Sequence, residues 1–482
     1  MAPRKQPSSL FDICVKNSIN LINSAVSTIE KKYPDNPNNE YETEALLLKE
    51  YLCSMLPARL LDILCSKRAC IPLTGDPCTQ LLVLTHPNLT VFHKSDHDNG
   101  IPLQFWLTII PTLTHLVVLD LKFICSDEIL GVVGSNCTLL EEINIVSRVD
   151  ICKSLFNASV LLRNVSDEGL TSVGKLKRLK IVTMDPPRHE RINKIGRCVS
   201  QLGIILLIRE LPYLEELRID TCDIGSTLIS THIDIGPLSL RKINCHFPSA
   251  DGIRKLLQIC PKLNELRVTH LSRCNKDAVL DEITNSDVKL HRLDLSFFVF
   301  TPSLENLLIV KGSYLTHFSL WEIEHSLTFD TIFCIGENCP NLSTLCLVTQ
   351  SSDLLVPRYF QRRHEFFATL RVLTIGNGNF NIDHILSFFL ECTSFLQKLV
   401  VKYQTKSNID GTILQLLRKG YLKEINYLWL DCTLEVSKNV VIEVIKMCDK
   451  LKTLTVDFSG SILTDIYKVI TDNNLDLKLG SY

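Results

Sequence analysis

The chain has 482 residues, of which 45% are hydrophobic and 22% charged, and its formal net charge is −2. This ordinary globular composition excludes a collagen-like or wholly disordered chain. The near-zero charge predicts neither general nucleic-acid binding nor attraction to anionic membranes. No apolar segment follows the basic start "MAPRKQPSSLFDIC", so we expect a chain of the cytoplasm, the nucleus or both, with no membrane partner.

The first 80 residues predict a small helical segment without repeats. Ser8 and Ser9 can cap a first helix with apolar positions at three- and four-residue spacing. A polar loop over 31–40 and a second helix over 43–55 follow, and Pro57 favours a third helix start.

The rest of the chain, residues 81–482, is built on an internal repeat. The pattern L-x-x-L-x-L, with other apolar residues sometimes replacing Leu, occurs thirteen times between Leu116 and Val456. Ten of the twelve intervals between its last positions lie between 23 and 29 residues, which is leucine-rich-repeat spacing. Each repeat predicts a short strand and then a helix, so the fold class is an α/β solenoid, a horseshoe with a concave parallel sheet and convex helices.

Two intervals are longer, 39 and 35 residues, and include 147–170 and 185–194. Extra residues in a repeat form either a loop on one face or a further convex helix. The final stretch, 463–482, is typical of a terminal helix and a partial strand that cap the core.

The chain holds 19 cysteines, scattered singly in apolar contexts, which indicates reduced thiols rather than a disulfide framework. "LLQICPKLNELRV" and "IGENCPNLSTLCL" resemble the cysteine-containing leucine-rich-repeat subtype, which is common in substrate adaptors of cullin–RING ubiquitin ligases. The matching cysteines at helix ends are Cys137, Cys260, Cys339, Cys392 and Cys448.

Two N-terminal stretches resemble docking motifs of such adaptors. Leu10 and Cys14 fit the BC box, a helix that docks Elongin C by inserting a leucine and a cysteine into a groove. "LPARLLDIL" is similar to the cullin box, through Leu56, Pro57, Leu60 and Leu64. Together they resemble the von Hippel–Lindau box of zyg-type ligase adaptors and imply Elongin B/C and a cullin as partners. Two other interpretations stay open: a plain N-terminal cap of the solenoid, and an F-box from Leu56 that would dock a Skp-type adaptor.

No phosphate-binding loop, nucleophile elbow or H-E-x-x-H motif occurs in the sequence, so we expect no catalysis and no cofactor. "HKSDHD" (93–98) places two histidines four residues apart, but its residues and the following Asn-Gly favour a turn over a metal site. Cys65, Cys70 and Cys78 lack zinc-site spacing.

Residues between the apolar positions of each repeat should project from the concave face, the surface on which solenoids bind proteins. The candidate residues for binding a target protein are His291, Arg292, His317, Trp321, Tyr427 and Trp429. The sequence therefore predicts a non-enzymatic substrate-recognition subunit of a cullin–RING ligase, with an intracellular scaffold or signalling protein as the alternative.

Overall fold

The structure is a computed structural model of the 482-residue chain. The residues that it describes are 10–33, 40–67, 76–95, 98, 100–146, 165–184, 199–219, 223–231, 233, 235–270, 275–323, 328–349, 366–376, 382–393, 395–402, 407–430, 434–456, 460–473 and 475–480. Most of 147–170, all of 185–194, Ser8, Ser9, Cys70 and His97 lie outside them, so the expectations for those positions stay predictions.

The described residues fall into two compact units. The N-terminal unit comprises residues 8–244 with 258–262, and the C-terminal unit comprises 245–257 with 263–482. The N-terminal unit contains α1 (Leu10–Lys32), α2 (Glu40–Met55), α3 (Ala58–Lys67), α4 (Pro77–Leu84), β1 (Val91–His93), α5 (Leu103–Ile109), η3 (Ile110–Thr112), β2 (Val118–Asp120), α6 (Asp127–Asn136), β3 (Glu142–Asn144), α8 (Asp167–Val173), β4 (Ile181–Thr183), α9 (Gln201–Glu210), β5 (Glu216–Arg218), α10 (Ile224–Thr231) and the start of β6 (Lys242–His246).

The C-terminal unit continues the same alternation of helix and strand. It contains most of α11 (Ala250–Ile259), then β7 (Glu265–Thr269), α12 (Lys276–Asn285), β8 (Arg292–Ser296), α13 (Pro302–Lys311), η5 (Gly312–Tyr314), β9 (His317–Ile323), α14 (Phe329–Asn338), β10 (Thr344–Thr349), β11 (Val372–Gly376), α15 (Ile382–Cys392), β12 (Lys398–Lys402), β13 (Ser407–Asn408), α16 (Asp410–Arg418), β14 (Tyr427–Leu430), β15 (Leu434–Glu435), α17 (Lys438–Met447), β16 (Thr453–Thr455), α18 (Gly460–Asp472) and β17 (Lys478–Gly480).

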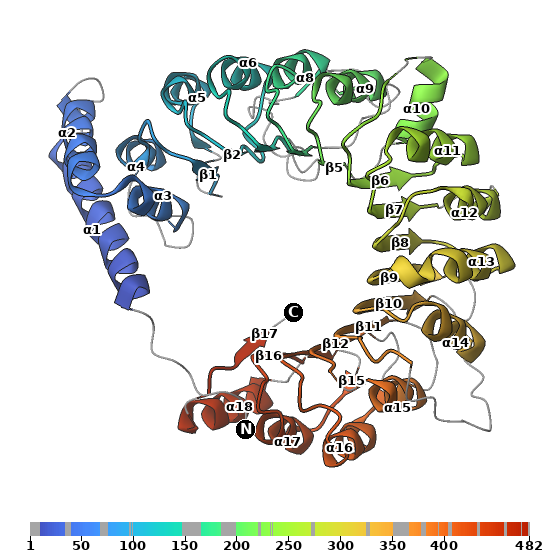
Figure 1. The fold of residues 1–482 in the computed structure, drawn as a ribbon. Helices are drawn as coiled ribbons and strands as arrows, with labels where there is room; N and C mark the ends of the chain where they lie inside the picture. The colour runs from blue at the N-terminus through green and yellow to red at the C-terminus, as the bar shows by residue number, and fades with distance from the viewer. Residues whose placement is uncertain are drawn as a thin grey trace, which may run out of the picture. The chain divides into compact units, whose positions relative to one another are not determined.

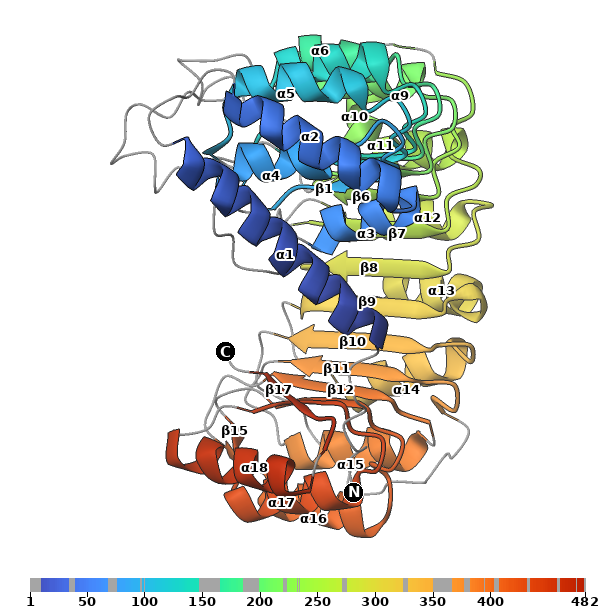
Figure 2. The ribbon, with the colours of Figure 1, turned by 90° about the vertical axis from the view of Figure 1, so that its left-hand side faces the viewer.

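The strands of each unit pair in parallel and follow one another in chain order. The order is β1 to β6 in the N-terminal unit and β7 to β12, then β14, β16 and β17, in the C-terminal unit. Within each unit the helices lie on one side of the sheet (Figure 1), and Figure 2 shows the strands of the C-terminal unit stacked edge to edge. The predicted α/β solenoid of leucine-rich-repeat type is confirmed.

The repeat fixes this architecture because its apolar positions form the core between strands and helices. The residues at the last apolar position of the thirteen repeats are at most 4% exposed. One strand–helix unit could not bury these side chains by itself, whereas stacked repeats share one continuous core. These buried residues are Leu121, Ile145, Met184, Ile219, Cys245, Val268, Leu295, Leu320, Leu347, Ile375, Val401, Leu430 and Val456.

The stacking begins one strand earlier than the first repeat found in the sequence. β1 pairs in register with β2, and Phe92 of β1 and the preceding Leu89 are buried like the equivalent residues of the later repeats. The stretch "LTVFHK" escapes the pattern because Lys94 stands at the last apolar position. At the other end, α18 and β17 form the predicted terminal helix and partial strand.

The cysteines at helix ends occupy a tight position between neighbouring repeats. Cys339 is the C-cap of α14, is 1% exposed, and donates its backbone N–H to Ile335. A Cβ on Gly312 of the preceding repeat would overlap the backbone carbonyl of Asn338 and stand 2.9 Å from the Cys339 sulfur. The Cys339 side chain therefore lies in close contact with the preceding repeat, where a small apolar side chain suits the space.

Within the described residues, no helix combines the length and apolar character needed to cross a membrane.

Candidate protein-binding surfaces

Helix α1 has two apolar faces on opposite sides. Val15, Ile19 and Val26 are at most 7% exposed and pack inside the N-terminal unit. Leu10, Cys14 and Leu21 are four and seven residues apart, so at about 100° per residue they lie on the opposite face. Leu10 is 77% and Leu21 72% exposed, and Cys14 is exposed as well. We call these three residues the docking stripe.

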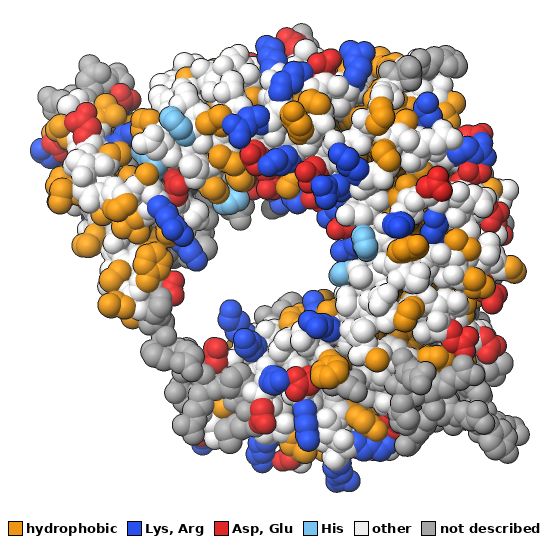
Figure 3. Space-filling model, viewed as in Figure 1, with side chains coloured by type: hydrophobic (Ala, Val, Ile, Leu, Met, Phe, Trp, Pro, Cys, Tyr) orange, Lys and Arg blue, Asp and Glu red, His pale blue; other side chains and the backbone are white. Residues whose placement is uncertain are grey.

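Helices α2, α3 and α4 hold α1 in place through its buried face. Lys32 at the end of α1 also pairs with Glu44 of α2, with 2.5 Å between Nζ and Oε1. Figure 3 shows hydrophobic side chains gathered over α1 and α2. On α2 the exposed members of this group are Leu46, Leu47, Tyr51 and Met55.

The second predicted box forms the start of α3. Pro57 is exposed and immediately precedes the helix, as expected for a proline that begins one, and its carbonyl accepts the N–H of Leu60. Leu56 and Leu60 are half-buried, whereas Leu64 is 0% exposed. Leu64 is therefore a core residue of the N-terminal unit, and only the other three positions present surface for a direct contact.

The side of each sheet that faces away from the helices carries the residues that alternate with the core positions. We call it the strand face of each unit. In β8 the alternation places Arg292, Asp294 and Ser296 on this face and Leu293 and Leu295 in the core. Register aligns Arg292 with His317 of β9, while His291 lies just before β8 and is exposed at its entrance.

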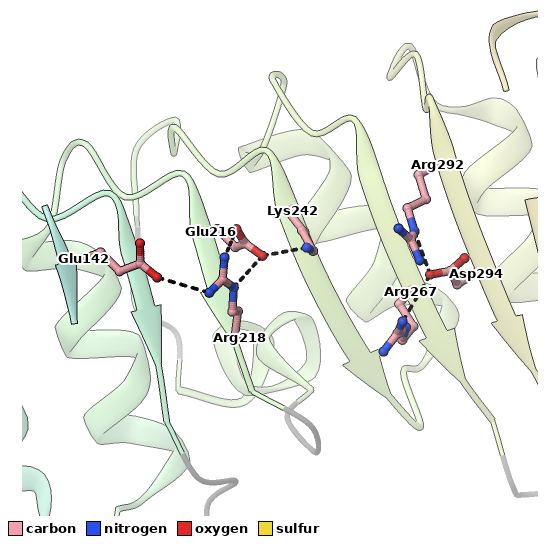
Figure 4. A network of polar contacts seen from close by, with 7 residues as sticks. All are labelled: Glu142, Glu216, Arg218, Lys242, Arg267, Arg292 and Asp294. Atoms are coloured by element: carbon pink, nitrogen blue, oxygen red, sulfur yellow. Dashed lines mark hydrogen bonds and ion pairs between the residues drawn. The ribbon is translucent and has the colours of Figure 1, made fainter. Parts of the chain in front are cut away.

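Arg292, one of the predicted binding residues, belongs to a charged cluster of the C-terminal unit (Figure 4), with His317 beside it and His291 at the strand entrance. The Oδ2 atom of Asp294 accepts hydrogen bonds from Arg292 Nε at 2.9 Å and Arg267 Nη2 at 3.3 Å. Asp294 is 2% exposed, and no described residue donates to its other oxygen. Burial and the nearby Arg292 cation lower the pKa of His317, against the opposing charges of Glu265 and Asp294. A neutral imidazole thus lies beside a guanidinium.

The other three predicted binding residues, Trp321, Tyr427 and Trp429, lie around two lysines that the sequence pattern does not indicate. Lys402 Nζ lies 5.7 Å from the ring centre of Trp321 and 5.2 Å from that of Trp429. Lys398 Nζ lies 4.5 Å from the ring centre of Tyr427. These distances are typical of cation–π contacts. Lys402 was overlooked because it follows the last position of the repeat pattern, although alternation through 398, 400 and 402 places it on the strand face.

The strand face of the N-terminal unit carries a different, internally paired network (Figure 4). Arg218 donates two hydrogen bonds to Glu216, at 2.8 and 3.0 Å, and a third to Glu142 at 3.3 Å. Lys242 Nζ lies 2.7 Å from Glu216. Burial acts to raise the pKa of Glu216, but the hydrogen bonds from Arg218 and Lys242 outweigh it and lower that pKa.

Metal-ligating side chains do not converge anywhere in the described part of the chain. His93 is exposed at the end of β1, and Ser95 and Asp98 form a turn in which the Ser95 N–H donates to Asp98 Oδ2 at 2.8 Å. Cys65 is buried, and burial also raises the pKa of Cys78 to about 11. Neither thiol has the environment of a reactive or ligating one.

These features define an α/β solenoid of leucine-rich-repeat type with two surfaces suited to protein binding. No protein-family model matches the chain, and no curated protein matches it. Among solved structures it is similar to the complex of Rad7 and Elc1 in yeast, with 15% identity, 76% of this chain and 98% of that chain covered, and a TM-score of 0.37. It is also similar to TLR13 in a TLR13–ssRNA13 complex, with 13% identity, 79% and 60% covered, and a TM-score of 0.34. Both likenesses concern the fold alone.

Proposed function

We propose that this chain is a non-enzymatic substrate-recognition subunit of a cullin–RING ubiquitin ligase. In this function α1 to α3 dock Elongin B/C and a cullin, and the strand face binds the target protein. Ubiquitin transfer is carried out by the partners.

The observation that carries this proposal is the exposure of the docking stripe. A plain N-terminal cap would bury Leu10 and Cys14 against α3 or the first repeat, but both point away from the unit's core. Burying an exposed leucine side chain is favourable by about 1.5–3 kcal/mol. Leu10 is 77% exposed, so a partner groove that covers it would gain most of this free energy. Apolar residues four and seven positions apart are the anchors that a helix presents to a groove.

The resemblance to the BC box and the cullin box indicates which partner would bind this surface. Leu10 and Cys14 match the BC box by type and spacing, and Leu56, Pro57 and Leu60 match the exposed part of the cullin box. Leu64 supports α3 from within. A Skp-type adaptor would instead use the α3 surface without needing the docking stripe, so the two partners are distinguishable by mutation.

The test is capture of purified Elongin B/C, a cullin and a Skp-type adaptor by the full chain. We expect Elongin B/C to bind, and the double substitution Leu10→Ala plus Cys14→Ala to weaken binding at least about tenfold. Leu202→Ala is the matched control, because Leu202 is an exposed leucine of α9 and is 45% exposed. Failure to capture Elongin B/C contradicts the proposed docking, and capture that survives the double substitution contradicts the assignment of the stripe.

A further inference from the structure

The C-terminal unit contains a lysine held between two indole rings. Lys402 of β12 extends toward Trp321 of β9 on one side and toward Trp429 of β14 on the other. All three side chains are half-buried on the strand face. We call this group the indole–lysine clamp.

The floor of the clamp is largely apolar and is shaped by one glycine. Gly376 of β11 lies between Val348 and Lys402 in the register of the sheet. A Cβ at Gly376 would stand 3.0 Å from Val348 and 3.4 Å from the Lys402 Cβ, so the glycine keeps this space open. Cys346 and Val400, both on the strand face, are 5% and 4% exposed. Thr374 of β11 stands between these two residues in register, so its hydroxyl belongs to the same surface.

Lys402 has three N–H donors, and the two rings attract its charge without accepting ordinary hydrogen bonds. Among the described residues no carboxylate pairs with it. Among the described residues no carboxylate pairs with four further cations either. Two of them lie in strands β12 and β17 and two just before β11 and β16: Lys398, Lys478, Arg371 and Lys452. The strand face of the N-terminal unit differs, because there Glu142 and Glu216 pair with Arg218 and Lys242.

We infer that the indole–lysine clamp is a binding site for an acidic, extended segment of a partner protein. A carboxylate of the segment bonds the Lys402 ammonium, and an adjacent apolar side chain packs against Trp321 or Trp429. The neighbouring lysines favour further acidic residues in the same segment. This inference rests on the proposed role of the strand face in target binding, but not on the docking stripe.

A protein segment fits better than a nucleic acid. Nucleic-acid binding draws on many phosphate contacts and a broad cationic field, whereas this chain has a net charge of −2. The largely apolar floor of Cys346, Val400 and Gly376 instead suits apolar side chains of an extended segment. From β9 to β14 is about 19 Å at ordinary strand spacing, which about six extended residues span.

Tryptophan fluorescence tests the site directly, because the chain has three tryptophans and Trp106 is 2% exposed in the N-terminal unit. The probe is a synthetic peptide of about ten residues made of Asp, Leu and Ser, titrated into the full chain. The matched peptide has Asn in place of Asp, and an oligothymidylate provides the nucleic-acid arm. We expect the acidic peptide to change the emission and the other two to bind at least about tenfold more weakly.

The variants separate charge from packing. Lys402→Met keeps the length of the side chain and should weaken acidic-peptide binding about tenfold, while Lys402→Arg should retain it. Lys419→Met is the control, because Lys419 lies 5.7 Å from the Tyr421 ring centre and pairs with Glu391 away from the strand face. Trp429→Phe should reduce the fluorescence response itself.

Three results would overturn the inference: no binding of the acidic peptide, equal binding of the Asn peptide or oligothymidylate, or unchanged affinity in Lys402→Met. Capture of Elongin B/C is measured in the same variants. If Lys402→Met loses peptide binding but still captures Elongin B/C, the peptide site is the clamp. If Leu10→Ala plus Cys14→Ala loses Elongin capture but still binds the peptide, that loss concerns the docking stripe alone.

Discussion

The carboxylate of Asp167 accepts two hydrogen bonds from Ser200, one from its backbone N–H at 2.8 Å and one from its hydroxyl at 2.7 Å. Asp167 begins α8, and Ser200 is the N-cap of α9 in the next repeat. Asp127 binds Ser166 in the same way, at 2.8 and 2.5 Å. Each such aspartate links the helix starts of two successive repeats, and a glycine leaves room for it: a Cβ on Gly203 would overlap the Asp167 carboxylate.

This arrangement predicts that Gly203→Ala destabilises the chain, although alanine ordinarily favours a helix. We expect a loss of about 1–3 kcal/mol in the free energy of unfolding, because the new methyl group displaces the carboxylate. In an Asp167→Ala background the same substitution should become neutral or stabilising. Urea denaturation of the four chains of this double-mutant cycle measures the coupling.

Gly131→Ala is the matched control for that cycle. Gly131 lies in α6, and a Cβ there meets no atom within 4 Å. The substitution should stabilise by about 0.5–1 kcal/mol. An equal cost of Gly203→Ala with and without Asp167 would show that the carboxylate does not need the space.

The cysteines predict a sharp contrast in alkylation. Burial raises the pKa of Cys260, Cys339 and Cys448 to about 12, so these thiols are both uncharged and inaccessible. Cys14 and Cys53 are exposed, although partial burial raises the pKa of the Cys53 thiol and should make it the slower of the two. Brief iodoacetamide treatment at about pH 8, read by peptide mass spectrometry, should modify the exposed pair and spare the buried three.

The same experiment follows the docking stripe. Bound Elongin C should protect Cys14 if its side chain enters the partner's groove, while the buried three stay unmodified throughout. Equal labelling of Cys14 with and without bound Elongin C would place the contact elsewhere. Rapid native labelling of Cys339 would contradict its tight position at the end of α14.

The buried histidine His86 predicts lower stability in mild acid. Its Nε2 lies 3.2 Å from Asp62 Oδ1, and its side chain is 4% exposed. Burial lowers the pKa of His86, with Lys49 acting in the same direction and Asp62 opposing them. The unfolded chain therefore binds the proton more readily, and His86 reduces stability as pH falls below its ordinary value of about 6.5.

His86→Gln keeps a polar side chain and removes this titration. Thermal melts between about pH 7.5 and 5.5 should show a smaller loss of stability in the variant than in the natural chain. An unchanged pH dependence would assign the effect to other groups, and His317→Gln serves as a comparison because burial lowers the pKa of His317 too.

The N-terminal helices show where local sequence patterns are sufficient and where they are not. Their existence followed from apolar spacing and Pro57, and α3 begins one residue after that proline. The pattern does not indicate which apolar residues are buried in the folded unit, because Leu10 and Leu64 both occupy apolar positions of a helix. Tertiary packing places Leu10 outside, at 77% exposure, and Leu64 inside, at 0%.

The strand face shows the same division. Alternation along each strand predicted that Trp321, Tyr427 and Trp429 would leave the core. It could not show that Trp321 and Trp429, 108 positions apart in the chain, lie on either side of Lys402. That proximity depends on how successive strands stack and on Gly376, which has no side chain to fill the space.

The spacing of apolar residues along the chain is enough to specify the repeat and with it the α/β solenoid, because stacked strand–helix units are the way to bury residues at that spacing. Which polar groups meet across strands, and which apolar residues stay exposed, follows from the packing of the folded chain. Register and packing between repeats set those distances, and they depend on residues tens to hundreds of positions apart, such as Asp167 with Ser200 and Trp321 with Lys402.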